Sequence, residues 1–228
     1  MAKFQEYPLL ALRGRVVFPD TTVNFDIGIM ISLTAVKYAS ERDSRIFVCA
    51  QKEAEKEEIT TTDVYLTGTV VKLRQITRLP GSNLRLSAEG LFRATAKQVR
   101  TEEGTFVAVV EEISPVHGDK TLEEAYFRTC KEIMRDITSS ENRFPKDASS
   151  NLDKCADADG FVNLAAHYLP LKVADKQKLL ECARTSERLQ TLDRFLNEEL
   201  EIMRLERKIN AAVRQNIDKN KKEFYLRE

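Results

Sequence analysis

The stretch TSERLQTLDRFLNEELEIMRLERKINAAVRQNIDKNKKEFYLRE, from Thr185 to Glu228, has the pattern of one long helix. Apolar residues recur in it at spacings of three and four, charged residues fill most other positions, and neither Gly nor Pro interrupts it. At about 1.5 Å per residue such a helix would extend roughly 60 Å, longer than a small domain is wide. We therefore expect it to begin in a folded body and to leave that body as an arm.

The apolar stripe on this helix needs a surface to pack against. We expect its first part, Leu189 to Leu196, to pack on the same chain. Two alternatives remain for the distal part, which contacts either another subunit or the helices of its own chain. The candidate arm contacts are Leu205, Ile209, Val213 and Ile217.

The composition argues against several classes of partner. Lys plus Arg and Asp plus Glu each number 36, so the formal net charge is 0 and a nucleic-acid partner is not favoured. The N-terminus lacks a basic segment followed by an apolar core, and no run approaches the roughly 20 apolar residues of a membrane span. The sequence therefore predicts a cytoplasmic protein without a membrane partner.

No pattern in the sequence indicates a catalytic, cofactor or metal site. The 4 cysteines are widely spread without a Cys-x-x-Cys pair, and His117 and His167 stand far apart, so no paired metal ligands occur. No glycine-rich loop followed by Lys and Ser or Thr is present to bind nucleotide phosphates, and no signature places a base beside a serine. We expect free thiols in a reducing compartment and no catalytic residue in this chain.

The first half of the sequence has short strand patterns with close turns, which favours a small antiparallel barrel with one or two helices. Ser32 is expected to cap a short helix, Gly90 to form a bulge, and residues 79–83 to form the turn of a hairpin. The expected strands cover residues 7–12, 23–27, 45–50, 64–76, 84–88, 92–99 and 106–113.

A boundary is expected at residues 114–119, because the hydrophobic period changes there from near 2 to near 3.6. Thr121 and Thr185 are expected to cap helices, and the polar stretch 138–151 is expected to be a loop before short helices at 160–169 and 175–184. The sequence thus predicts an α+β fold with a β-rich domain, a helical bundle and a long arm. These parts cover residues 1–118, 119–184 and 185–228, respectively.

Short motifs follow one another along nearly the whole chain: PLLALR at 8–13, VVFP at 16–19, AQK at 50–52, DVYLTGTV at 63–70, LPG at 79–81, EGLFR at 89–93, ERL at 187–189, RKI at 207–209 and EFYLRE at 223–228. In order and approximate spacing they resemble the N-terminal region of the ATP-dependent Lon proteases, least clearly from 138 to 159. Ala11, Gly14, Asn24 and Ile29 depart from the residues usual in that family. These departures bear on substrate preference more than on the fold.

The resemblance implies a barrel of the pseudouridine-synthase-and-archaeosine-transglycosylase type, PUA-like for short, followed by a helical bundle and an arm. It also implies a longer parent protein, a homohexameric ATP-dependent serine endopeptidase of protein quality control. In that parent an AAA+ ATPase, with ATP and Mg²⁺, and a protease domain with a Ser-Lys dyad would follow residue 228. This chain would be its non-catalytic part, which recognises unfolded or damaged proteins and delivers them.

Unfolded proteins expose apolar segments, so an apolar patch on the barrel is the expected recognition surface. The candidate substrate contacts are Phe18 and Pro19 in the first turn, and Leu79 and Pro80 at the hairpin tip. The alternative is that Phe18 and Leu79 pack in the core or in the turn. Two other functions are also open, a stand-alone scaffold built on the same barrel and, less favoured by the zero net charge, a PUA-like RNA-binding module.

Overall fold

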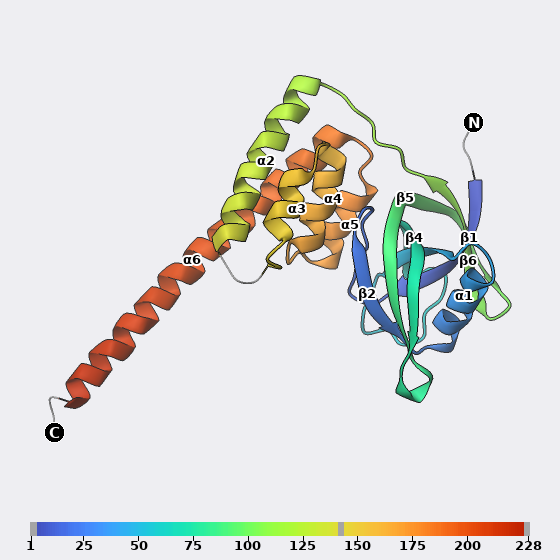
Figure 1. Ribbon diagram of the computed structural model, residues 1–228, viewed down its shortest axis with the longest axis horizontal. Helices are drawn as coiled ribbons and strands as arrows, with labels where there is room; N and C mark the ends of the chain where they lie inside the picture. Colours follow the sequence, from blue (N-terminus) through green and yellow to red (C-terminus); the bar gives the residue numbers. More distant parts are fainter. Residues whose placement is uncertain (1–3, 141–143, 226–228) are drawn as a thin grey trace.

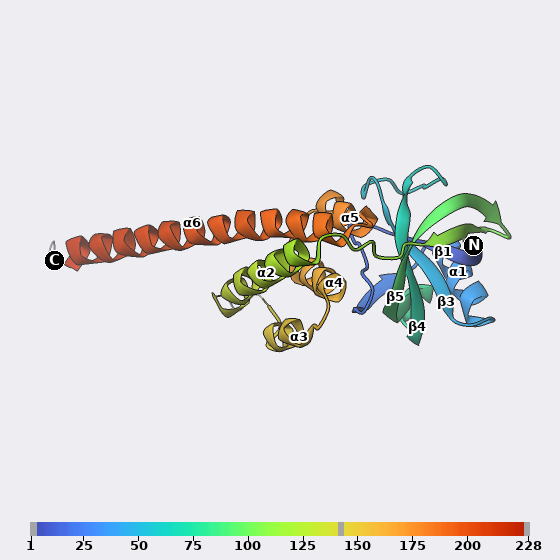
Figure 2. The same cartoon turned by 90° about the horizontal axis from the view of Figure 1, so that it is seen from above.

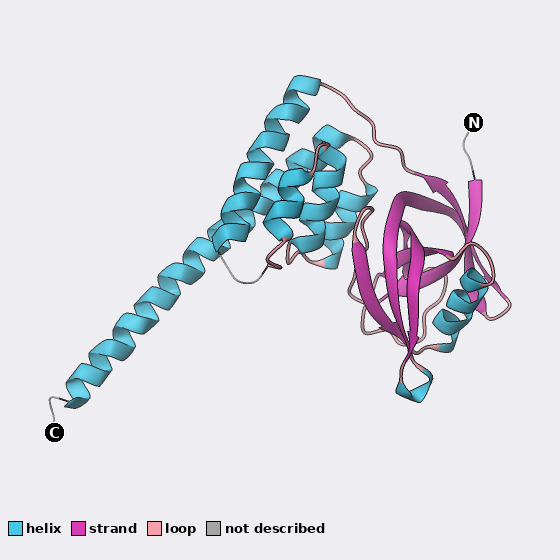
Figure 3. Cartoon of the chain, viewed as in Figure 1, coloured by secondary structure: helices cyan, strands magenta, loops and turns pink. Residues whose placement is uncertain are grey.

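The computed structural model describes residues 4–140 and 144–225, so the last three residues of the EFYLRE motif lie outside it. A β-rich part is followed by a helical part and a projecting helix (Figures 1 and 3). The first part comprises β1 (Phe4–Leu12), β2 (Thr22–Ile27), α1 (Met30–Ser40), β3 (Arg45–Gln51), β4 (Val64–Arg78), the 3₁₀ turn η1 (Pro80–Ser82), β5 (Leu84–Glu102) and β6 (Thr105–Glu112). The second comprises α2 (Lys120–Ser140), α3 (Ala148–Lys154), α4 (Ala158–Tyr168), α5 (Val173–Glu181) and α6 (Thr185–Tyr225). The predicted α+β class is confirmed.

The strands form one 6-stranded sheet in the order β2-β5-β4-β3-β1-β6, which closes into a barrel because β5 also pairs with β6. The 19-residue β5 is long enough to pair with β2 and β4 near its start and with β6 near its end. The expectation of a purely antiparallel barrel is wrong at one place, since β1 and β3 are parallel. β2 and α1 provide the crossover that a parallel pair requires.

Alternation along β1 and β3 creates two cores, because successive side chains face opposite sides of the sheet. One core lies inside the barrel and contains Leu9 and Phe47. The other contains Leu10 and Val48, and is covered by α1 and β2. The sheet is therefore buried on both sides here, so these strands have continuous apolar sequences.

Gly90 marks the predicted bulge and also a close approach of two segments. Val70 pairs with Phe92 and Val71 with Gly90, so one residue of β5 is left over between them. A Cβ on Gly90 would lie 2.1 Å from the backbone oxygen of Phe18, closer than any real contact. The bulge bends β5 without ending it, and the two strands expected at 84–88 and 92–99 are therefore one strand.

The polar stretch 138–151 is not the continuous loop that we expected. α2 extends to Ser140 and α3 begins at Ala148. Ala148 and Leu152 are buried against the other helices, so two apolar side chains four residues apart fix a short helix in an otherwise polar sequence.

All three predicted N-caps are wrong in detail. Ser32 lies inside α1, which begins two residues earlier, and Thr185 is itself helical. The cap of α2 is Asp119, whose Oδ1 accepts the backbone N–H of Thr121 at 2.9 Å. The Thr185 hydroxyl instead donates to Asp159 Oδ2 at 2.6 Å, so a tertiary contact has taken the place of the cap.

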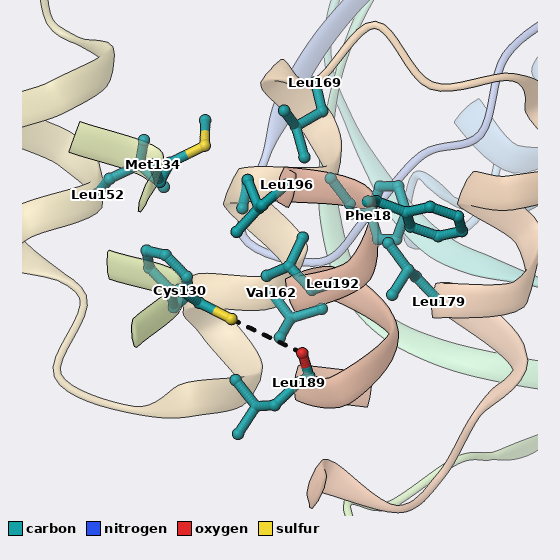
Figure 4. Close-up of a cluster of buried hydrophobic side chains, with 14 of the residues drawn as sticks. Phe18, Cys130, Met134, Leu152, Val162, Leu169, Leu179, Leu189, Leu192 and Leu196 are labelled. Carbon is teal, nitrogen blue, oxygen red and sulfur yellow. Dashed lines mark hydrogen bonds between the residues drawn. The ribbon is translucent and has the colours of Figure 1, made fainter. Parts of the chain in front are cut away.

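The first part of α6 packs in the helical core beside α2, as predicted for Leu189 to Leu196. Leu189, Leu192 and Leu196 are fully buried, and Cys130 Sγ on α2 contacts the Leu189 oxygen at 3.6 Å (Figure 4). Beyond Met203 the helix leaves the other elements and projects into solvent (Figure 2). The predicted long helix, 41 residues, is confirmed.

Candidate functional site

A groove of about 950 Å³ opens on the β-rich part, between the end of β1, the free edge of β2, the start of α1 and the loop that joins β3 to β4. Its volume is typical of binding sites. The apolar lining residues are Ala11, Leu12, Phe25, Ile27, Ile29, Ile31 and Ile59. The polar or charged ones are Arg13, Arg15, Asn24, Asp26, Ser32, Gln51, Glu57, Glu58 and Arg85. We call this site the groove.

Hydrogen bonds hold the charged rim of the groove in place. Arg85 donates from Nε and Nη2 to the two carboxylate oxygens of Asp26, at 2.8 Å each. The hydrogen bond with Arg85 lowers the pKa of Asp26 and raises that of Arg85. Arg13 Nη2 donates to the Glu57 backbone oxygen at 3.3 Å, which ties the β3–β4 loop to the end of β1.

β2 forms one wall of the groove and is an edge strand, since β5 is its only partner in the described sheet. Arg15 Nη1 donates to the Asn24 backbone oxygen at 2.8 Å, so this carbonyl points away from β5. Peptide groups of alternate residues in an antiparallel strand point to the same side. Asn24 and Asp26 therefore direct their backbone polar groups toward the groove, where an extended chain could pair with them.

A second cavity, of about 320 Å³, lies where the barrel meets α4 and α5. We call it the cleft. Three of its lining residues are basic, namely Arg15, His167 and Lys176, and none is acidic. Lys176 Nζ donates to the His167 backbone oxygen at 3.3 Å. Leu12, Arg15 and Phe25 line both cavities, so the cleft adjoins the groove.

The basic side chains of the cleft have altered proton affinities. Burial, followed by repulsion from Arg15, lowers the pKa of Lys176 to about 8. Burial also lowers the pKa of His167, assisted by Lys176 and Arg15. At neutral pH Lys176 is therefore still mostly charged and His167 mostly neutral.

Two of the four candidate substrate contacts are buried, which corrects our expectation for them. Phe18 is 0% exposed, and Pro19 is also buried. Phe18 packs in the helical core (Figure 4), so it joins the barrel to the helices and is not available to a substrate. At the hairpin tip, Leu79 is half-buried and Pro80 is exposed.

Sequence reasoning missed the apolar residues of the groove. Ile29 and Met30 are 48% and 74% exposed where β2 ends and α1 begins, and Ile59 lies in the loop across the groove. The sequence contained a sign of these residues. The expected strand 23–27 ends at Ile27, but the apolar residues Ile29, Met30 and Ile31 follow it. Apolar residues without a strand partner at such a junction favour a surface patch.

The candidate arm contacts are exposed on α6, and no described part of the chain covers them. Their exposed fractions are 55% for Leu205, 61% for Ile209, 49% for Val213 and 48% for Ile217. The alternative in which these residues pack back on the chain's own helices is therefore not what the structure shows.

Within the described residues, no cluster of His, Cys, Asp and Glu side chains is suited to hold a metal ion. The same residues include no helix that is both long and apolar enough to cross a bilayer. The described cysteines are free thiols, and burial raises the pKa of Cys49 and Cys130 to about 12. Such thiols are poor nucleophiles.

Comparison with known sequences places nearly the whole chain in one family. Residues 6–198 match the family described as the ATP-dependent protease La (LON) substrate-binding domain. The Lon protease of Clostridioides difficile (strain 630) is 36% identical over 98% of this chain, and that of Heliobacterium modesticaldum is 35% identical over 98%. The chain spans only 29% and 28% of these relatives' own lengths.

Solved structures share the fold at lower sequence identity. The N-terminal domain of a Mycobacterium avium complex Lon protease matches with a TM-score of 0.67 at 17% identity, over 85% of this chain and 98% of that one. A Lon N-terminal domain protein from Xanthomonas campestris matches with a TM-score of 0.59 at 19% identity, over 82% and 96%. These matches and the sequence relatives agree, and the chain belongs to the family of Lon substrate-binding domains.

Proposed function

We propose that this chain recognises unfolded or damaged polypeptide through the groove and delivers it to a protease within one longer protein. Membership of a substrate-binding family supports the recognition step, and the relatives' name supports a proteolytic parent. The observation that carries the proposal is the groove itself, because Ile29 in its lining is 48% exposed and Ile31 and Ile59 are partly exposed beside it. A folded protein rarely leaves such a patch without a partner.

The lining of the groove suits a client without a fixed sequence. Apolar side chains on its floor accept the residues that a native protein buries, and the edge of β2 offers hydrogen bonds to any backbone. Contacts of this kind are individually weak. Their effect would grow by avidity when several copies act together in a homohexamer.

In this proposal α6 is the connection to the motor. Its exposed stripe would contact other subunits or the next domain of a cytoplasmic, ATP-dependent serine protease. ATP and Mg²⁺ would act in an AAA+ module outside this sequence. The arm would hold the barrels at a distance from that module, since α6 projects about 30 Å beyond Met203 at 1.5 Å per residue.

Binding of a reduced and carboxymethylated, permanently unfolded protein tests the proposal. Ile29→Ser should weaken binding by roughly tenfold, the fold-change for one buried apolar side chain. Leu66→Ser is the matched control, because Leu66 is 51% exposed but lies outside the groove. If both substitutions weaken binding of the unfolded protein equally, or if neither weakens it, the groove is not the recognition surface.

The same experiment separates the other functions. A scaffold would bind a folded partner with no preference for the unfolded protein. An RNA-binding module would show affinity for RNA that falls steeply with salt. If the chain binds a folded partner or RNA but not the unfolded protein, the corresponding alternative function takes the place of the one proposed here.

A further inference from the structure

The cleft contains positive charge that none of its own lining residues neutralises. Lys176 forms no ion pair with a described carboxylate, and the cavity has no acidic lining residue. The carboxylate that acts on Arg15, Asp26, lies outside the cleft and is already paired with Arg85. Asp175, the nearest acid on α5, is paired with Lys178 Nζ at 2.8 Å. Lys176 is half-buried, and a half-buried cation without a counterion is costly to maintain, which points to a negatively charged ligand.

The rest of the cleft is apolar. Leu12, Val23, Phe25, Leu171 and Val173 line it together with the basic residues. A small inorganic anion would leave these walls unused. A carboxylate carried by an apolar group would satisfy both the walls and the charges.

The groove and the cleft are adjacent, since both are lined by Leu12, Arg15 and Phe25. Figure 1 shows the corresponding arrangement, with β2 lying between the rest of the barrel and the helices α4 and α5. A chain that pairs with the edge of β2 would thus have one end near Lys176. Because the cleft is smaller than the groove, 320 Å³ against 950 Å³, it suits the end of a chain better than its middle.

We propose that the cleft binds the C-terminal carboxylate of a polypeptide whose preceding residues lie in the groove. Arg15 and Lys176 would supply the charges, and the apolar walls would take the last side chain. This inference rests on the proposed function, since it assigns an orientation to the same client. Under this proposal, a client polypeptide is recognised by a free C-terminal carboxylate that follows an apolar last residue.

Fluorescence anisotropy with two decapeptides of one apolar sequence tests this inference. One peptide ends in a free acid and the other in an amide, and both carry a dye at the N-terminus. The acid should bind roughly tenfold more tightly, as expected for a charge-assisted hydrogen bond. Lys176→Gln and Arg15→Gln should each reduce that ratio toward one.

Lys178→Gln is the control, because Lys178 lies on the same helix but has an exposed side chain paired with Asp175. It should leave the ratio unchanged. Raising the pH from 7 to 9.5 should weaken binding of the acid but not of the amide, since Lys176 loses its charge near pH 8. The basic groups that face Lys176 are Arg15 and His167, and burial lowers the pKa of His167 below 6.5, so its charge changes little above pH 7.

The outcomes distinguish the two proposals. Equal affinity for acid and amide would overturn the assignment of the cleft, while binding that still depends on Ile29 would leave the groove in place. Binding of neither peptide would overturn both. A ratio that survives Lys176→Gln in a protein with an unchanged circular dichroism spectrum would also overturn the role of Lys176.

Discussion

Arg188 offers the sharpest test of how the helices are held together. Its side chain is 0% exposed. The guanidinium donates to Asn163 Oδ1 at 2.7 Å and to the Leu179 backbone oxygen at 3.0 Å, and it also pairs with Asp159 Oδ1. Burial lowers the pKa of Arg188, whereas Asp159 opposes that change.

Substitution Arg188→Met keeps the apolar stem but removes the charge. Asp159, which is 9% exposed, then keeps only two partners among those described above. These are the Thr185 hydroxyl and the guanidinium of Arg93 at 3.9 Å. Breaking a buried pair by removing one partner costs about 3–5 kcal/mol. In a chain of 228 residues we expect the melting temperature to fall by about 10 °C.

Urea unfolding followed by circular dichroism at pH 7 measures this loss. The control is Arg184→Met, because Arg184 is exposed and its ion pair with Glu187 spans 3.7 Å. The free energy of unfolding of this variant should change by less than about 1 kcal/mol. The double variant Arg188→Met with Asp159→Asn should lose less than the sum of the single variants. A loss below about 1 kcal/mol for Arg188→Met alone would refute the argument.

Three further predictions follow from other sites. Gly90→Ala should destabilise the protein by about 1–3 kcal/mol, because its Cβ would overlap the Phe18 oxygen, whereas Gly118→Ala, with its nearest contact at 3.9 Å, should have little effect on the melting temperature. Lys176→Met should stabilise the protein at pH 7, since its folded pKa of about 8 lies below the ordinary value of 10.5; the advantage should shrink as the pH of the urea titration approaches 10. Any association of the chain seen by light scattering across a concentration series should be weakened by Ile209→Glu, and an unchanged profile in an associating protein would exclude the α6 stripe as the contact.

Periodic apolar patterns predicted most of the fold. The strands of the barrel and the length of α6 follow from local spacing, because burial on one face dictates that spacing. The parallel pairing of β1 and β3 could not be predicted in the same way, since it depends on where β2 and α1 cross the sheet. The predicted caps failed for a related reason, because the Thr185 hydroxyl bonds to Asp159, 26 residues away in sequence.

The candidate site was harder to predict than the fold. Phe18 has the same apolar character whether it contacts a substrate or the core, and only the arrangement of the helices around it shows that it is buried. The groove combines residues from β1, β2, α1 and the β3–β4 loop, which run from Ala11 to Ile59, with Arg85 of β5 added. No local pattern indicates that these segments meet.

The buried arginines connect the barrel to α6. Arg93 on β5 donates to the backbone oxygens of Leu180 and Cys182, at 3.1 and 2.6 Å, and lies 3.9 Å from Asp159. Asp159 on α4 in turn holds Arg188 on α6. One carboxylate therefore lies between an arginine of the barrel and an arginine of the arm, and it links the two parts. Under the function proposed above, a client in the groove and the arm would be connected through this carboxylate.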